Sequence, residues 1–243
     1  SEIAEVFAKW NNGVLDSYLI QITSEILAFK DTDGSSLVDK IFDSAGQKGT
    51  GKWTVISSAN LGQPVTLISE ALYPRFISSL KTQRHSASSA FPREEIAKPE
   101  NTSSFIDELE QALYASKIIS YTQGYMLMTA AAADYNWKLN YSGIATMWSG
   151  GCIIRSKFLS DIAAAYQTNP DLQSLLFDDF FKTAVRNADS AWRKVIISAV
   201  QSGIPAPAMS SALSFFDSYR SDVLPANLIQ AQRDYFGAHT YER

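Results

Sequence analysis

Apolar positions recur three and four residues apart along most of this 243-residue chain, which is the spacing of helices that bury one face. The pattern predicts helices over residues 2–10, 14–30, 36–42, 53–60, 65–86, 104–135, 152–166, 171–202, 208–219 and 225–235, with irregular or short-helical structure over 137–151. Sustained alternation of apolar and polar residues, the mark of strands, is nearly absent. We therefore predict an all-α fold, with residues 1–243 forming one large multi-helix domain.

Two of the predicted helices are long enough to form a core. The first is expected to start at Ser104, which forms a capping-box-like pair with Asp107, and to run to about Tyr135. The second is expected to start at Asp171. Its apolar stripe is predicted to consist of Leu172, Leu176, Phe180, Ala184, Ala188, Ala191 and Val195. Because both helices are too apolar and alanine-rich to be solvated on most faces, we expect burial against neighbouring helices and a partner subunit.

Two shorter stretches carry specific expectations. Pro74 lies inside the helix predicted over 65–86 and should kink it or lower its stability. Residues 86–102 are rich in serine, proline and alanine and are predicted to form an exposed loop.

Composition excludes several classes of protein. Hydrophobic residues make up 46% of the chain and the net charge is -4, so no general affinity for nucleic acid is expected. No apolar run approaches the roughly 20 residues that span a bilayer, so no membrane association is expected.

The N-terminus does not read as a signal peptide, and the single Cys152 excludes an internal disulfide. Two histidines and one cysteine predict no metal site. A cytoplasmic protein is the expectation.

Residues 43–54 are the stretch with the clearest candidate chemistry. They contain three glycines together with Lys48, Lys52 and Thr50, and this composition favours binding of an anion, above all a phosphate. Residues 46–52 match a nucleotide-binding P-loop at seven positions, but Trp53 replaces the required hydroxyl and no strand precedes the loop, which argues against a nucleotide hydrolase. A glycine-rich linker that binds nothing remains an alternative at this point.

Residues 41–53 together with 112–121, 150–156 and 224–241 resemble 6-phosphogluconate dehydrogenase, and the resemblance extends over essentially the whole chain. It implies an oxidoreductase of the pentose phosphate pathway that oxidatively decarboxylates 6-phosphogluconate to ribulose 5-phosphate with NADP. It also implies a homodimer whose chains join a Rossmann coenzyme domain to a helical C-terminal domain. This chain matches only the helical part, so NADP is expected to bind mainly to the missing N-terminal domain, and no catalytic residue is expected here. The chain alone is therefore expected to be inactive.

The resemblance assigns substrate-binding residues position by position. Lys48, Thr50 and Arg75 match the family's phosphate and substrate contacts, whereas Arg233 and His239 match residues that reach into the partner's site. Arginine presents a planar fork suited to two phosphate oxygens, which agrees with this assignment. His85, beside Arg84 and Lys81, is expected to lie on a solvated helix face. The alternative function is a non-catalytic helical oligomerisation or scaffold module derived from the enzyme.

Overall fold

The computed structural model describes residues 1–93 and 101–243. The described residues form eleven α-helices and two 3-10 helices and contain no β-sheet, only two isolated bridges, so the all-α prediction is confirmed. The elements in order are α1 (Glu2–Trp10), α2 (Tyr18–Ala28), η1 (Leu37–Lys40), α3 (Thr50–Asn60), α4 (Thr66–Ser79), α5 (Lys81–Ala90), α6 (Thr102–Asp134), α7 (Tyr141–Ser149), α8 (Phe158–Thr168), η2 (Leu175–Phe177), α9 (Asp179–Gln201), α10 (Pro207–Tyr219) and α11 (Ala226–Gly237). Within the described part of the chain, no helix is both long enough and apolar enough to cross a membrane.

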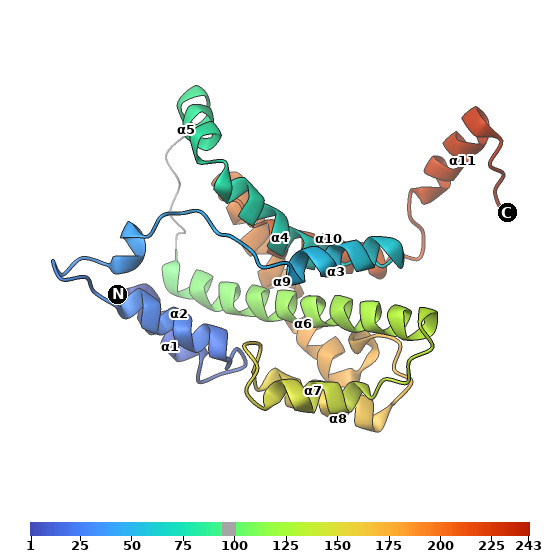
Figure 1. Ribbon diagram of the computed structural model, residues 1–243, viewed down its shortest axis with the longest axis horizontal. Coiled ribbons are helices and arrows are strands. Elements are labelled where there is room, and N and C mark those ends of the chain that lie inside the picture. The colour runs from blue at the N-terminus through green and yellow to red at the C-terminus, as the bar shows by residue number, and fades with distance from the viewer. Residues whose placement is uncertain (94–100) are drawn as a thin grey trace.

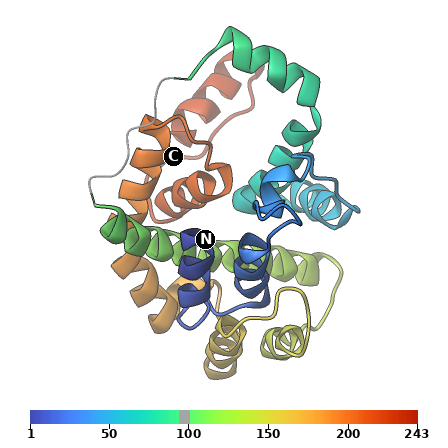
Figure 2. The same ribbon diagram turned by 90° about the vertical axis from the view of Figure 1, so that its left-hand side faces the viewer.

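Helix α6 runs through the middle of the molecule and organises the remaining helices (Figure 1). The pairs α1–α2 and α7–α8 lie on one side of it, and α3, α4 and α10 lie on the other, as the turned view also shows (Figure 2). Helix α9 packs along α6. The prediction of two long core helices is therefore confirmed, and the site described below lies on the side of α6 that carries α3 and α4.

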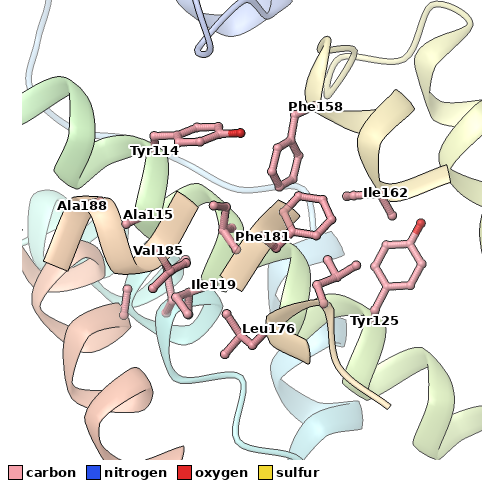
Figure 3. Packing of buried hydrophobic residues seen from close by; sticks show 14 of the residues in the cluster. Tyr114, Ala115, Ile119, Tyr125, Phe158, Ile162, Leu176, Phe181, Val185 and Ala188 are labelled. Carbon is pink, nitrogen blue, oxygen red and sulfur yellow. The ribbon is translucent and has the colours of Figure 1, made fainter. Parts of the chain in front are cut away.

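The centre of the core is aromatic (Figure 3). The ring of Phe181 meets the ring of Phe158 edge-on at a centroid distance of 5.2 Å. Tyr125 stacks on Tyr166 at 5.0 Å, which joins α6 to α8. Edge-on and stacked aromatic pairs stabilise more than their buried area alone. These contacts lock α6, α8 and α9 together.

The starts of the long helices differ from the prediction. Helix α6 begins at Thr102, because the Asn101 side chain accepts a hydrogen bond from the Ser104 amide and caps the helix; the capping box at Ser104 was wrong. Helix α9 begins at Asp179 rather than Asp171, with Asp178 as its cap. The predicted helix over 152–166 begins only at Phe158.

The later start of α9 also changes which of its residues are buried. Phe181 is fully buried, whereas Phe180, which the predicted stripe placed in the core, is 50% exposed. The residues buried along α9 are Phe181, Val185, Ala188, Ala191, Trp192 and Val195. The predicted stripe assumed one continuous helix from residue 171 onwards. Residues 172–176 in fact precede α9, so they do not share its helical rotation. The 3-10 turn η2 and the cap at Asp178 interrupt that rotation, so the stripe was wrong at Phe180.

The helix predicted over 65–86 is two helices. Helix α4 ends at Ser79, and α5 starts at Lys81 after a break at Leu80, whose backbone leaves the helical region. Pro74 does not end α4, which continues for five more residues. Of the 86–102 loop, residues 86–90 are helical and residues 94–100 lie outside the described part. The break at Leu80 becomes important for the site.

Two other predicted helices are shorter or less buried than expected. The helix over 36–42 is only the 3-10 turn η1. Helix α2 has the spacing of a buried face, yet none of its residues is fully buried, and Leu19 and Ile26 are half exposed. Helical spacing predicts an apolar face, but the packing of the whole chain decides whether that face is covered.

The first turn of α4 is anchored by a side chain from α6. No side chain of its own segment caps α4. Instead, the Gln123 Oε1 atom accepts from the Leu67 amide at 3.0 Å, and its Nε2 donates to the Thr66 hydroxyl at 3.0 Å. Gln123 is fully buried. It therefore fixes the position of α4 against α6.

Replacing Gln123 by leucine is expected to lower the free energy of unfolding by about 1–3 kcal/mol, because the buried Leu67 amide loses its acceptor. Urea unfolding measures the loss. The control is Gln111→Leu at an exposed position of the same helix, which should stay within about 0.5 kcal/mol of the wild type. Similar losses at both positions would contradict the anchoring role of Gln123.

Candidate functional site

The glycine-rich loop leads directly into the N-terminus of α3. Helix α3 begins at Thr50, three residues before the predicted start at Trp53, and Gly49 precedes it. Gly49 has φ = 118°, a left-handed conformation that is strained for any residue with a Cβ atom, and the Trp53 ring packs against it. The loop therefore presents Lys48 and Thr50 on either side of a turn that depends on glycine.

The first amides of α3 form an anion-binding arrangement. The N–H groups of the first helical turn have no intrahelical acceptor, and no side chain caps this helix. Within the described residues, no hydrogen bond is formed by the amides of Thr50, Gly51 or Lys52. Free amides at a helix N-terminus attract phosphate through their N–H groups and through the helix dipole. With the exposed side chains of Lys48 and Thr50 beside them, these amides can bind an anion.

Replacing Gly49 by alanine is expected to lower the free energy of unfolding by about 1–2 kcal/mol, because the left-handed conformation strains an L residue. Thermal or urea unfolding measures this loss of stability. Gly46→Ala in the same loop is the matched control, since a Cβ atom there meets nothing within 4 Å and needs no left-handed backbone. If Gly46→Ala lost as much stability as Gly49→Ala, the proposed turn geometry would be wrong.

Arg75 lies against this loop. It comes from the exposed side of α4, one residue after Pro74, and its guanidinium donates a hydrogen bond to the Gly46 carbonyl. This contact brings Arg75 against the loop that carries Lys48, the two residues that the family resemblance assigns to substrate binding. The guanidinium has further N–H groups, so it can bind the loop and an anion at the same time.

Ion pairs attach the loop to the junction of α4 and α5. The Asp43 carboxylate accepts from Lys81 Nζ at 2.6 Å and from Arg84 Nη2 at 2.7 Å. The two cations lower the pKa of Asp43 to about 2. The face that carries Lys81, Arg84 and His85 is solvated, as expected, but its two cations also pair with Asp43, which the sequence did not predict. Sequence reasoning missed these contacts because it continued the helix through Leu80.

Arg233 and His239 are not brought to the loop within one chain. Helix α11 stands apart from the helical body (Figure 1), and both side chains are exposed. The segment after α11 folds back on it: the Thr240 amide donates to Asp234 Oδ1 at 2.8 Å, and Gln230 Nε2 donates to the Thr240 carbonyl at 2.7 Å. Arg233 also donates to Gln230 at 3.1 Å. The helix and the segment after it therefore present Arg233 and His239 from one folded unit.

A pocket of about 490 Å³ lies along α6, and α3 and α4 contribute to its lining. Its lining is largely apolar and includes Leu19, Tyr121, Trp148 and Ile154, together with Lys117. The Lys117 Nζ atom is buried without a hydrogen-bond partner in the described residues, and it lies 5.5 Å from the centroid of the Phe158 ring. Desolvation lowers the pKa of Lys117 to about 8, and nearby Asp16 opposes that shift.

Replacing Lys117 by methionine is expected to raise the free energy of unfolding at pH 7 by at most about 3 kcal/mol. Because the pKa of Lys117 is near 8 in the folded chain and near 10.5 when unfolded, the unfolded chain holds more protons between these values. The wild type therefore gains stability as the pH rises from 8 towards 10, and the difference from the variant shrinks. Urea unfolding at pH 7 and 9.5 measures both effects. The exposed Lys138→Met variant should show neither, and a pH-independent difference for Lys117→Met would contradict this prediction.

No cluster of three or more histidine, cysteine or carboxylate side chains in the described residues could hold a metal ion. The groups gathered at this place are the loop amides and the side chains of Lys48, Thr50 and Arg75. This arrangement can bind a phosphate group and orient the rest of a ligand.

The family model described as the C-terminal domain of 6-phosphogluconate dehydrogenase matches residues 1–243. The chain is 61% identical over 242 residues to the decarboxylating 6-phosphogluconate dehydrogenase 1 of Saccharomyces cerevisiae, covering 99% of this chain and 50% of that protein. It is 57% identical over 242 residues to the decarboxylating 6-phosphogluconate dehydrogenase of Homo sapiens, with the same coverage. The chain thus spans about half the length of the curated relatives it matches.

A solved structure of Plasmodium falciparum 6-phosphogluconate dehydrogenase has the same fold. It superposes with a TM-score of 0.97 at 47% sequence identity, covering 99% of this chain and 52% of that chain. That protein has been solved in its apo form, with its cofactor NADP+ and with its substrate 6-phosphogluconate.

Proposed function

This chain belongs to the 6-phosphogluconate dehydrogenase family, as its C-terminal domain, and we propose that it forms the substrate-binding and dimerisation part of such an enzyme. The whole protein would oxidise and decarboxylate 6-phosphogluconate to ribulose 5-phosphate, with NADP as the hydride acceptor, in the cytoplasm. NADP would bind mainly to a coenzyme domain outside these 243 residues, and the chain alone would not turn over substrate.

The observation that supports this proposal is the convergence of Arg75 and the glycine-rich loop at the N-terminus of α3. The phosphate of 6-phosphogluconate would accept from the free amides of the first turn, from Lys48 and Thr50, and from the fork of Arg75. Charge-assisted hydrogen bonds of this kind are stronger than neutral ones, so they would hold the phosphate firmly. This leaves the sugar-acid end of the substrate to extend towards catalytic groups supplied from elsewhere.

Calorimetric titration of the chain with 6-phosphogluconate and with gluconate tests the proposed phosphate site. The two ligands differ only in the phosphate, so we expect binding of the first and no measurable binding of the second. Equal binding heats for 6-phosphogluconate and gluconate would contradict the proposed phosphate site. A further measurement is NADPH formation from 6-phosphogluconate and NADP: we expect none from the 243 residues alone and turnover from the whole protein.

We also propose that the protein is a homodimer whose α11 completes the site of the partner subunit. Two observations support it: α11, which carries Arg233 and is directly followed by the segment with His239, stands apart from the helical body (Figure 1), and α11 exposes a large apolar surface. Tyr235 is 95% exposed, and Phe236, Leu228 and Ile229 are also exposed. An apolar surface of this kind is typical of an interface.

A heterodimer of whole-protein subunits tests whether the site is shared. One subunit carries Arg75→Ala and the other Arg233→Ala, and two different affinity tags allow the mixed dimer to be isolated. If α11 serves the partner, one site of the heterodimer is intact and the other has lost both arginines, so one equivalent of 6-phosphogluconate binds with wild-type affinity. If each chain completed its own site, no wild-type site would remain.

A further inference from the structure

The loop that carries Lys48 is attached to the rest of the molecule mainly at the junction of α4 and α5. The Ala45 amide donates to the Ser78 hydroxyl at 2.9 Å, and the Gly46 carbonyl accepts from Arg75. At the start of the loop, Asp43 forms the ion pairs with Lys81 and Arg84. Since η1 ends at Lys40 and α3 starts at Thr50, no helix of its own stiffens this loop.

Asp43 and Arg84 form the centre of this attachment. The Asp43 carboxylate binds both cations, and its backbone carbonyl also accepts from Arg84 Nη1 at 3.4 Å. The same Arg84 Nη1 donates to the Ser78 carbonyl at 3.1 Å, so one guanidinium joins the loop to the last turn of α4. The break at Leu80 makes this possible, because it turns the first residues of α5 towards the loop.

We infer that Asp43 is a positioning residue for the proposed phosphate site, acting through Lys81 and Arg84 to hold Lys48. Lys48 is followed by the fixed turn at Gly49 and preceded by the attachment at residues 43–46. With both ends held, the Lys48 backbone keeps its place beside Arg75 and the first amides of α3. The inference rests on the proposed function, since Lys48 is a substrate contact only within it.

The ion pairs of Asp43 are too exposed to act mainly on global stability. The side chains of Asp43, Lys81 and Arg84 are 51%, 49% and 36% exposed. Exposed ion pairs contribute little to folding and are screened by salt. Loss of these ion pairs should change the local order of the loop more than it changes global stability. The reason is that an irregular segment opens locally at a small fraction of the global unfolding free energy. We therefore expect Asp43 to control the loop while leaving the fold intact.

The first experiment measures the loop without any ligand. In Asp43→Asn, hydrogen exchange of the Ser44 and Ala45 amides, which are hydrogen-bonded in this loop, should rise about tenfold, while the melting temperature should change by less than about 2 °C. The matched control is Asp33→Asn, which removes an exposed lysine pair of the same kind, Lys40–Asp33 at 2.7 Å, and should leave exchange of these two amides unchanged. Unchanged exchange in Asp43→Asn would overturn the inference.

The second experiment tests whether Asp43 acts through Lys48. We expect Asp43→Asn to weaken binding of 6-phosphogluconate to the chain about tenfold by calorimetry, and less than about twofold when Lys48→Ala is already present. Equal weakening in both backgrounds would show that Asp43 does not act through Lys48 and would overturn the inference. A wild-type chain that binds no 6-phosphogluconate would instead contradict the proposed site, whereas the exchange experiment would still decide whether Asp43 orders the loop.

Discussion

Replacing Phe181 by alanine is expected to lower the free energy of unfolding by about 3–5 kcal/mol, which is the largest loss of stability predicted for this chain. Phe181 is fully buried and lies edge-on to Phe158 at 5.2 Å, in the centre of the aromatic core (Figure 3). Removing its ring leaves a cavity between α6, α8 and α9 that close packing prevents from collapsing. Urea unfolding followed by circular dichroism measures the loss.

The neighbouring Phe180 provides an internal control for this prediction. It has the same side chain on the same helix turn, but half of it is exposed. We expect Phe180→Ala to cost less than about 1 kcal/mol, because little apolar surface returns to water. Comparable losses at both positions, or a larger loss at Phe180, would mean that the rotation of α9 follows the stripe predicted from sequence.

Replacing Arg75 by alanine is expected to weaken binding of 6-phosphogluconate by about 10- to 100-fold, the largest expected effect on function. In the proposed site the variant would lose a charge-assisted hydrogen-bond donor to the phosphate, and the Gly46 carbonyl loses its contact with the guanidinium. Arg75→Lys keeps the charge but not the planar fork, so its affinity should be intermediate. Calorimetric titration with 6-phosphogluconate measures the dissociation constants of the wild type, Arg75→Ala and Arg75→Lys.

A control for net charge separates a local effect of Arg75 from a general one. Arg186 is exposed on α9, away from the loop, and Arg186→Ala removes the same charge. We expect its affinity for 6-phosphogluconate to equal that of the wild type. Equal heats for Arg75→Ala and the wild type would remove Arg75 from the site.

The packing of α4 explains why a proline before Arg75 is tolerated. Proline in a helix interior removes one backbone hydrogen bond and crowds the preceding turn. Helix α4 nevertheless continues through Pro74 to Ser79, and it packs against α10 and α3. Burial of Leu67 and Leu72 on its inner face, together with the anchor at Gln123, offsets the cost. The guanidinium of Arg75 therefore still reaches the loop.

The sequence alone determined the features that depend on short spacings. Helical periodicity predicted an all-α fold with two long core helices, because residues three and four apart share a helix face wherever that helix packs. The composition of residues 43–54 indicated a phosphate-binding loop, since glycine, lysine and threonine carry the required backbone freedom, charge and donors themselves. The resemblance to the family identified Arg75 as its companion, and the structure places Arg75 against the loop.

Only the tertiary structure decided the features that depend on residues distant in the chain. The register of α9 follows the cap at Asp178 and the packing of Phe181 on Phe158, not the apolar stripe alone. The anchor of α4 is a glutamine 56 residues away, and the cations that hold Asp43 lie about 40 residues beyond it. Periodicity carries no information about such partners, because hydrogen bonds and ion pairs form between groups that the fold brings together. The loop's own residues therefore indicate which groups it can offer to an anion, but they do not indicate where the loop lies in the fold.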